Sequence, residues 1–135
     1  MARMKPMSRH TRRGVSLVES AFMIPILMAL IFGAIEFGSV LHMRHTMLHA
    51  AREAARSLAI QGSSTSQAIA LAESLLPDSE DLRFEVNATE PPPDAALRKV
   101  DVTITLPLTD ASLGDMFGIF GDNDLTVRVS MRSEQ

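Results

Sequence analysis

Three histidines and a glutamate recur at helical spacing in the first half of the chain, at His42, His45, His49 and Glu53. On a helix these positions form one stripe, because residues three and four apart share a face. Imidazoles at i and i+4 can chelate a divalent ion. The same stripe also fits a polar helix surface beside lipid headgroups or a partner subunit. We favour this second interpretation and predict no metal site.

Other chemistry has little support in the sequence. There is no cysteine, no glycine-rich phosphate loop and no histidine beyond His49. Asp122-Asn123-Asp124 could suggest a calcium site, but it lacks the spacing and the twelfth-position glutamate of an EF-hand loop. We therefore predict a turn at these residues. Asn87-Ala88-Thr89 is a glycosylation sequon by pattern only. We therefore predict that the protein is not an enzyme, with no cofactor and no small-molecule substrate.

An apolar run dominates the N-terminal third and predicts a membrane segment. Residues 20–35 are uncharged, and as a helix they cover about 24 Å, a little less than a hydrocarbon core of about 30 Å. Residues 15–41 cover about 40 Å, so Glu19 and Glu36 fall near the two edges. A secretory signal peptide is the first alternative, but its apolar core is shorter and small residues follow it. A plain signal anchor is the broader alternative.

Charge predicts the orientation of this segment. Residues 1–13 carry five basic and no acidic side chains, whereas the remainder has a net charge of −8. Basic flanks stay on the cytoplasmic side. We expect a single-pass membrane protein with a cytoplasmic N-terminus and an extracytoplasmic domain. This distribution does not suit nucleic-acid binding.

Glu19 is costly inside an apolar helix unless a positive group compensates it. The pattern of Gly14, Val15 and Glu19 after a basic leader resembles the type III signal of type IV prepilins, although Ser20 stands where these signals often carry an aromatic residue. The resemblance implies that a prepilin peptidase cuts after Gly14. The new amine of Val15 would then pair with Glu19 of a neighbouring chain.

Two further motifs, Ile35-Glu36-Phe37-Gly38 and Ala50-Ala51-Arg52-Glu53-Ala54-Ala55-Arg56, resemble the TadE-like family of the tight-adherence (Flp) pilus system. The second commonly has glycine where this chain has Ala54. The resemblance implies a minor pseudopilin that supports pilus assembly and surface attachment, with other pilins and the platform proteins as partners. Its expected partner contacts are Glu19, Glu36, Phe37, Gly38, Arg52, Glu53 and Arg56.

Two alternatives stay open. One is the sister family TadF, which shares this architecture. The other is an uncleaved single-pass membrane protein whose outer domain is a binding module, for example for an envelope partner or a cell-wall glycan. Cleavage after Gly14 would discriminate the pilus hypothesis from the binding module.

Periodicity predicts the elements that position these residues. We expect a basic leader over 1–14 that is disordered, a transmembrane helix over 15–41 with a kink at Pro25, its amphipathic extension over 42–61, and an α+β domain over 62–135. The extension has an apolar stripe at Val40, Met43, Met47, Ala51, Ala54 and Leu58. In the outer domain, a capping box at Ser64 and Gln67 starts a short second helix to Leu76, with Ala68, Ile69, Ala72, Leu75 and Leu76 buried.

Alternating apolar residues predict three strands, around 82–88, 100–106 and 125–131. Loops are expected at 90–94, and a helical turn within 113–120. The strands would form a small antiparallel sheet packed on both helices, an α+β fold in which the strand order is not predicted.

Overall fold

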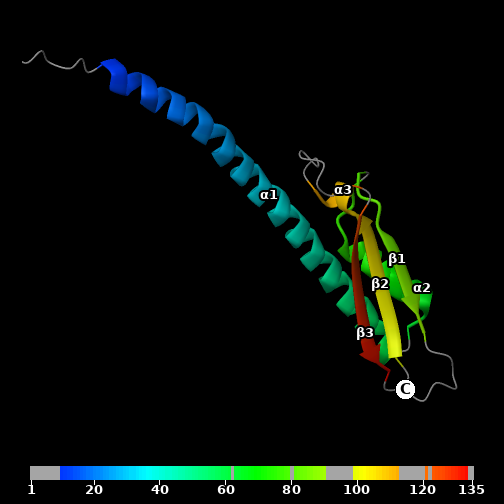
Figure 1. The fold of residues 1–135 in the computed structure, drawn as a ribbon. Helices are drawn as coiled ribbons and strands as arrows, with labels where there is room; N and C mark the ends of the chain where they lie inside the picture. The colour runs from blue at the N-terminus through cyan, green and yellow to red at the C-terminus, as the bar shows by residue number, and fades with distance from the viewer. Residues whose placement is uncertain are drawn as a thin grey trace, which may run out of the picture. The chain divides into compact units, whose positions relative to one another are not determined.

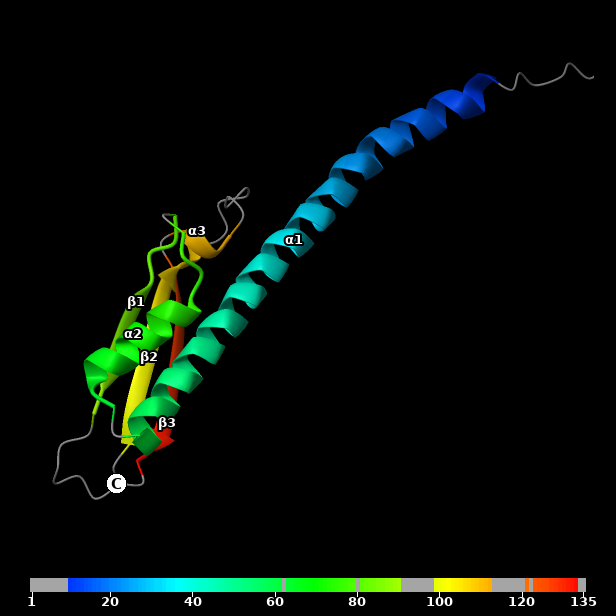
Figure 2. The ribbon, with the colours of Figure 1, turned by 180° about the vertical axis from the view of Figure 1, so that it is seen from behind.

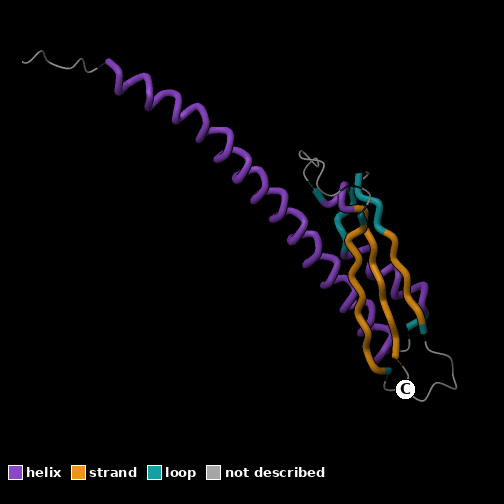
Figure 3. Tube along the Cα trace, viewed as in Figure 1, coloured by secondary structure: helices purple, strands orange, loops and turns teal. Residues whose placement is uncertain are grey.

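The computed structural model describes residues 10–61, 63–79, 81–90, 99–112, 121 and 123–133 (Figure 1). It confirms the α+β class: a long apolar helix, a short second helix and a three-stranded antiparallel sheet (Figure 3). Two compact units, Met1–Ile35 and Glu36–Gln135, are described separately below. The elements are α1 (His10–Gln61), α2 (Thr65–Leu75), β1 (Glu85–Thr89), β2 (Lys99–Pro107), α3 (Leu108–Ala111) and β3 (Asp124–Arg132).

The first unit contains the apolar part of α1. The helix begins at His10, not near Val15, so the prediction of a disordered leader is wrong for residues 10–13. No glycine or proline interrupts these residues, and arginine is a good helix former. Residues 1–9 lie outside the described part. The helix continues through Pro25, a residue that transmembrane helices tolerate.

The apolar side chains of this unit face outward. Phe22 is 72% exposed and Leu30 is 67% exposed, as expected for a surface that lipid would cover. Among the described residues, one helix is long and apolar enough to cross a membrane, at Ser16–Ile60. This helix fits a single-pass membrane protein.

In the second unit, the last part of α1 supplies one wall of the core. Met47, Ala51, Ala54 and Leu58 are buried, which confirms the predicted stripe, and Val40 and Met43 pack against it. Three alanines beside the stripe are also buried, so the apolar surface is wider than predicted: Ala50, Ala55 and Ala59.

Helix α2 begins as predicted. The Ser64 hydroxyl accepts from the amide of Gln67 at 3.3 Å, and the Gln67 side chain accepts from the amide of Ser64 at 3.1 Å. Together they satisfy two amides that a helix start leaves unpaired. Ala68, Ala72 and Leu76 are buried, but the prediction is wrong for Leu75, which is 38% exposed.

The sheet has the order β1-β2-β3, with both pairs antiparallel. Val86 lies opposite Ile104, and Val102 lies opposite Val129. The even-numbered residues of β2 are buried along the strand, so the predicted inward face is confirmed. Among the described residues, α2 and the last part of α1 lie on this face, and neither covers the other face (Figures 1 and 2).

Strand β1 begins at Glu85, three residues after the predicted start. The amide of Leu82 donates to Ser79 O at 3.1 Å, and the amide of Arg83 donates to Asp110 Oδ2 at 3.3 Å. These amides therefore serve a turn and a side-chain contact instead of the strand ladder. Three predictions lie wholly or partly outside the described residues: the loop at 91–94, the helical turn within 113–120, and the turn at Asp122.

Candidate assembly site

The expected processing site lies on the helical backbone of α1, at Gly14 and Val15. Glu19 follows Val15 by four residues, so both positions are on one face of the helix. The Glu19 side chain is exposed. One residue further, the Ser20 hydroxyl donates to Ser16 O at 3.0 Å, which satisfies that hydroxyl within the helix.

The Glu36-Phe37-Gly38 motif is divided between two faces of α1. Glu36 is only 5% exposed and interacts within its own chain, whereas Phe37 is 61% exposed. A side chain at Gly38 would meet no atom within 4 Å, and the same holds at Gly33. Phe37 and the two glycines are therefore open to a neighbouring helix, while Glu36 faces the domain of its own chain.

A polar junction around α3 lies close to Glu36. One turn after Glu36, the Ser39 hydroxyl donates to Ala111 O at the end of α3, at 3.0 Å. At the start of α3, the amide of Leu108 donates to Asn123 O at 2.9 Å. Helix α3 thus connects α1 with the segment that leads into β3.

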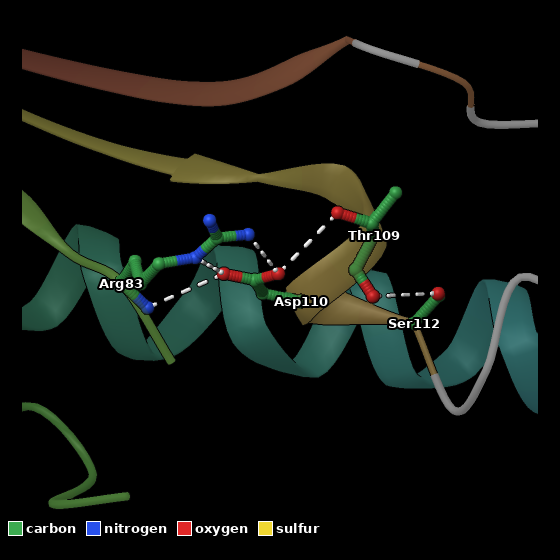
Figure 4. Close-up of polar contacts among 4 residues, drawn as sticks. All are labelled: Arg83, Thr109, Asp110 and Ser112. Atoms are coloured by element: carbon green, nitrogen blue, oxygen red, sulfur yellow. Dashed lines mark hydrogen bonds and ion pairs between the residues drawn. The ribbon is translucent and has the colours of Figure 1, made fainter. Parts of the chain in front are cut away.

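The strongest ion pair of this junction joins Arg83 to Asp110 (Figure 4). Nε of Arg83 donates to Oδ2 and Nη2 donates to Oδ1, both at 3.0 Å, so the contact is bidentate. The hydrogen bonds and charge of Arg83 hold the pKa of Asp110 below its ordinary value. Thr109 adds a hydroxyl donor at 3.3 Å, and Ser112 closes the α3 turn by donating to Thr109 O.

The alanine–arginine run of α1 also has two faces. Ala50, Ala51, Ala54 and Ala55 are fully buried in the core. The three charged side chains of the run, which the sequence analysis assigned to partner contacts, are exposed: Arg52, Glu53 and Arg56. No ion pair joins Glu53 to Arg56 in the part of the chain that the structure describes. The alanines let α1 approach the sheet, and the charges stay available to another molecule.

The histidine stripe borders a hollow of about 380 Å³ that His42, His45, Thr46, His49 and Leu75 line. Leu75 brings the end of α2 against this part of α1, which explains why it is not in the core. Among the described residues, no group of three or more possible ligands is arranged to hold a metal ion.

Sequence reasoning missed the polar contacts that depend on tertiary structure. On the uncovered face of the sheet, Nη2 of Arg128 donates to Asp101 Oδ2 at 2.8 Å, and the Ser130 hydroxyl donates to the other carboxylate oxygen. Arg128 and Ser130 hold the pKa of Asp101 below its ordinary value. Asp101 lies opposite Ser130 in the register of β2 and β3. This contact could have been predicted from the sequence only if the strand order had been known.

Comparison with known proteins gives one match. The model of the TadE-like protein family matches residues 14–56, which confirms over this segment the resemblance that the motifs indicated. The matched segment begins at Gly14 and ends at Arg56, so it contains both motifs and Glu19. No curated protein and no solved structure matches the chain.

Proposed function

We propose that this protein, whose residues 14–56 match the TadE-like family, is a minor pseudopilin that supports assembly of tight-adherence pili and thereby surface attachment. The observation that carries the proposal is the extent of the match. It begins at the glycine after which a prepilin peptidase would cut and ends where the exposed arginines of α1 end. The globular unit then accompanies the helix without a catalytic role of its own.

The first step of this function is removal of the leader between Gly14 and Val15. Both residues lie in the helical backbone of α1, whereas proteases generally cleave extended peptides. The first turns of α1 must therefore unwind in the peptidase. Gly14 makes this easier, because glycine destabilises a helix by about 1 kcal/mol relative to alanine.

Glu19 has its role after cleavage. A carboxylate at the centre of a bilayer costs about 2.5–3.5 kcal/mol on insertion scales, which is an upper bound for Glu19 because this residue is expected near an edge. The amine of Val15 from a neighbouring copy would compensate that charge as helices pack side by side. The exposed position of Glu19 and the open surface at Gly33 and Gly38 support this packing, since small residues let helices approach closely.

Glu36 has a different role in this proposal. The sequence analysis assigned it to a contact with a sister pseudopilin or the platform protein. Its burial supports a contact within the chain instead, beside the Ser39–Ala111 hydrogen bond. Phe37, which is exposed, is the residue of this motif that we assign to a partner.

The orientation follows from charge. The five basic residues before Gly14 would stay in the cytoplasm, so that the globular unit lies outside the inner membrane. The prepilin peptidase, other pilins and the platform proteins are the expected partners. TadF remains the alternative family role for the same architecture.

The test is the intact mass and N-terminal sequence of the protein from membranes, with and without the prepilin peptidase of the host. The proposal predicts a start at Val15 that depends on the peptidase. A leader that stays intact under both conditions would favour the uncleaved membrane protein with a binding module. In a second experiment, we expect Glu19→Ala to insert and to lose piliation, with Glu19→Asp as the conservative control. Normal piliation of Glu19→Ala would remove this residue from the mechanism.

A further inference from the structure

We propose that copies of this protein associate head to tail through their globular units. Arg52, Arg56 and Ile60 of one copy, the basic row, would contact a hollow of the next copy that carries Glu73 and Asp78, the acidic hollow. This inference goes beyond the proposed pilus function, because it names a contact between the globular units of two copies and does not require cleavage of the leader.

The basic row lies on the surface of α1 that faces away from the sheet. Its three members are four residues apart, so their side chains follow one another along the helix surface. Both arginines are exposed, and Ile60 is 58% exposed. Neither arginine has an ion-pair partner in the described part of the chain. The row therefore presents two exposed cations and one apolar side chain.

The acidic hollow lies where α2 ends and the chain turns toward β1. It has a volume of about 440 Å³, and Leu76, Pro77, Leu82 and Phe84 contribute apolar lining. Glu73 and Asp78 line the same hollow, and both are exposed. No ion pair with either carboxylate is present among the described residues. The hollow thus combines two exposed anions with an apolar surface.

The two surfaces are complementary in both respects. Two cations face two anions, and Ile60 has an apolar counterpart in Leu82 and Phe84. Complementary charges on opposing surfaces favour encounter and fix the register of a contact. A second copy of the chain satisfies both surfaces at once. An anionic lipid surface would attract the basic row but repel the acidic hollow.

The contact joins two different surfaces, so it is heterologous and leaves one surface of each end copy open. It also shifts neighbouring copies along the axis of α1. Leu75, next to the acidic hollow in sequence, lies against His42, His45 and His49. Arg52 and Arg56 follow these histidines by several residues, which corresponds to a shift of about 10–15 Å at 1.5 Å per residue. The contact therefore builds a stepped row of copies.

The absence of cysteine from the sequence allows a direct test with single engineered thiols. Arg56→Cys and Asp78→Cys full-length chains, with tags of different size, are purified in detergent, mixed and treated with a short bismaleimide. We expect a cross-linked heterodimer in the mixture and little product from either variant alone. The matched control pairs Arg56→Cys with Thr126→Cys, an exposed position on the uncovered face of the sheet.

Charge reversal tests the specificity of the contact. Glu73→Arg in the Asp78→Cys chain should lower the heterodimer yield about five- to tenfold, because one ion pair becomes a repulsion. Arg52→Glu in the Arg56→Cys chain should restore it. The proposal is overturned if the heterodimer yield equals that of the Thr126→Cys control, or if Arg56→Cys chains link mainly to themselves. Since these chains retain the leader, failure here leaves the cleavage test of the pilus function unaffected.

Discussion

Replacing Ala54 by leucine tests the close approach of α1 to the sheet. Ala54 is fully buried, as are Ala50 and Ala51 on the same side of the helix. Leucine adds three carbon atoms at a position with no exposed surface. Extra atoms in a well-packed core typically cost about 1–3 kcal/mol. We therefore expect the globular unit to lose this much free energy of unfolding while the membrane helix is unaffected.

Amide hydrogen exchange of β2 in the full-length protein in detergent measures this loss. Val102 and Ile104 report on the centre of the sheet, because both are fully buried and their strand pairs on both sides. A loss of about 1–3 kcal/mol lowers their protection roughly 5- to 150-fold. The matched control is Ala70→Leu on the exposed side of α2, which should change protection by about twofold or less.

A second substitution at the same position tests the opposite change in side-chain volume. Ala54→Gly removes one buried methyl group, worth about 0.8 kcal/mol, and about 1 kcal/mol of helix propensity. It should therefore also destabilise the unit. The reasoning is refuted if Ala54→Leu leaves the protection of β2 within twofold of the parent protein, because the position would then have space that the structure does not show.

Three further predictions concern the globular unit. Ile104→Ala should lower the free energy of unfolding by about 2–5 kcal/mol, because it leaves a cavity where a fully buried side chain was. Urea titrations followed by circular dichroism measure this loss. A loss no larger than that of a surface substitution would contradict the position of Ile104 in the core. Ser64→Ala should cost about 1 kcal/mol through loss of the helix cap, with Ser66→Ala as the control, and an unchanged transition would show that the cap contributes nothing. The lowered pKa of Asp110 means that its contribution to stability is present above the unfolded pKa and is lost as the pH falls through the folded pKa. Below about pH 4, an acid titration should therefore destabilise the parent protein more than Asp110→Asn, and identical pH profiles would refute this role.

Much of the fold could be predicted because its local signals agree with its tertiary structure. The alternation along β2 is read directly from the sequence and is found in its burial pattern. The capping box at Ser64 needs only four consecutive residues to form. By contrast, the start of β1 depends on Asp110, which is 27 residues away from Arg83, and no local pattern contains that contact. The exposure of Leu75 likewise depends on where α1 passes.

Sequence reasoning named the candidate residues, but it did not predict which of them face the domain of their own chain. Glu36, Phe37 and Gly38 are consecutive, so their side chains point about 100° apart around the helix. The motif alone does not show which of these directions faces the domain and which faces outward. The apolar stripe from Val40 to Leu58 contained that information, since Glu36 precedes Val40 by one turn. Extending the stripe backwards would have placed Glu36 on the buried face.

This division gives the matched segment 14–56 two separate tasks. Its inward residues, Glu36 and the alanines of the run, attach α1 to its own domain. Substitution of these residues should first lower the free energy of unfolding of the globular unit. Its outward residues, Glu19, Phe37 and the arginines, contribute little to that core. Substitution of these residues should weaken association with other molecules without unfolding the globular unit. A variant that loses piliation is therefore informative about assembly only when the protection of β2 is retained. That criterion assigns Glu36 to the first class and Arg56 to the second, although the same matched segment contains both residues.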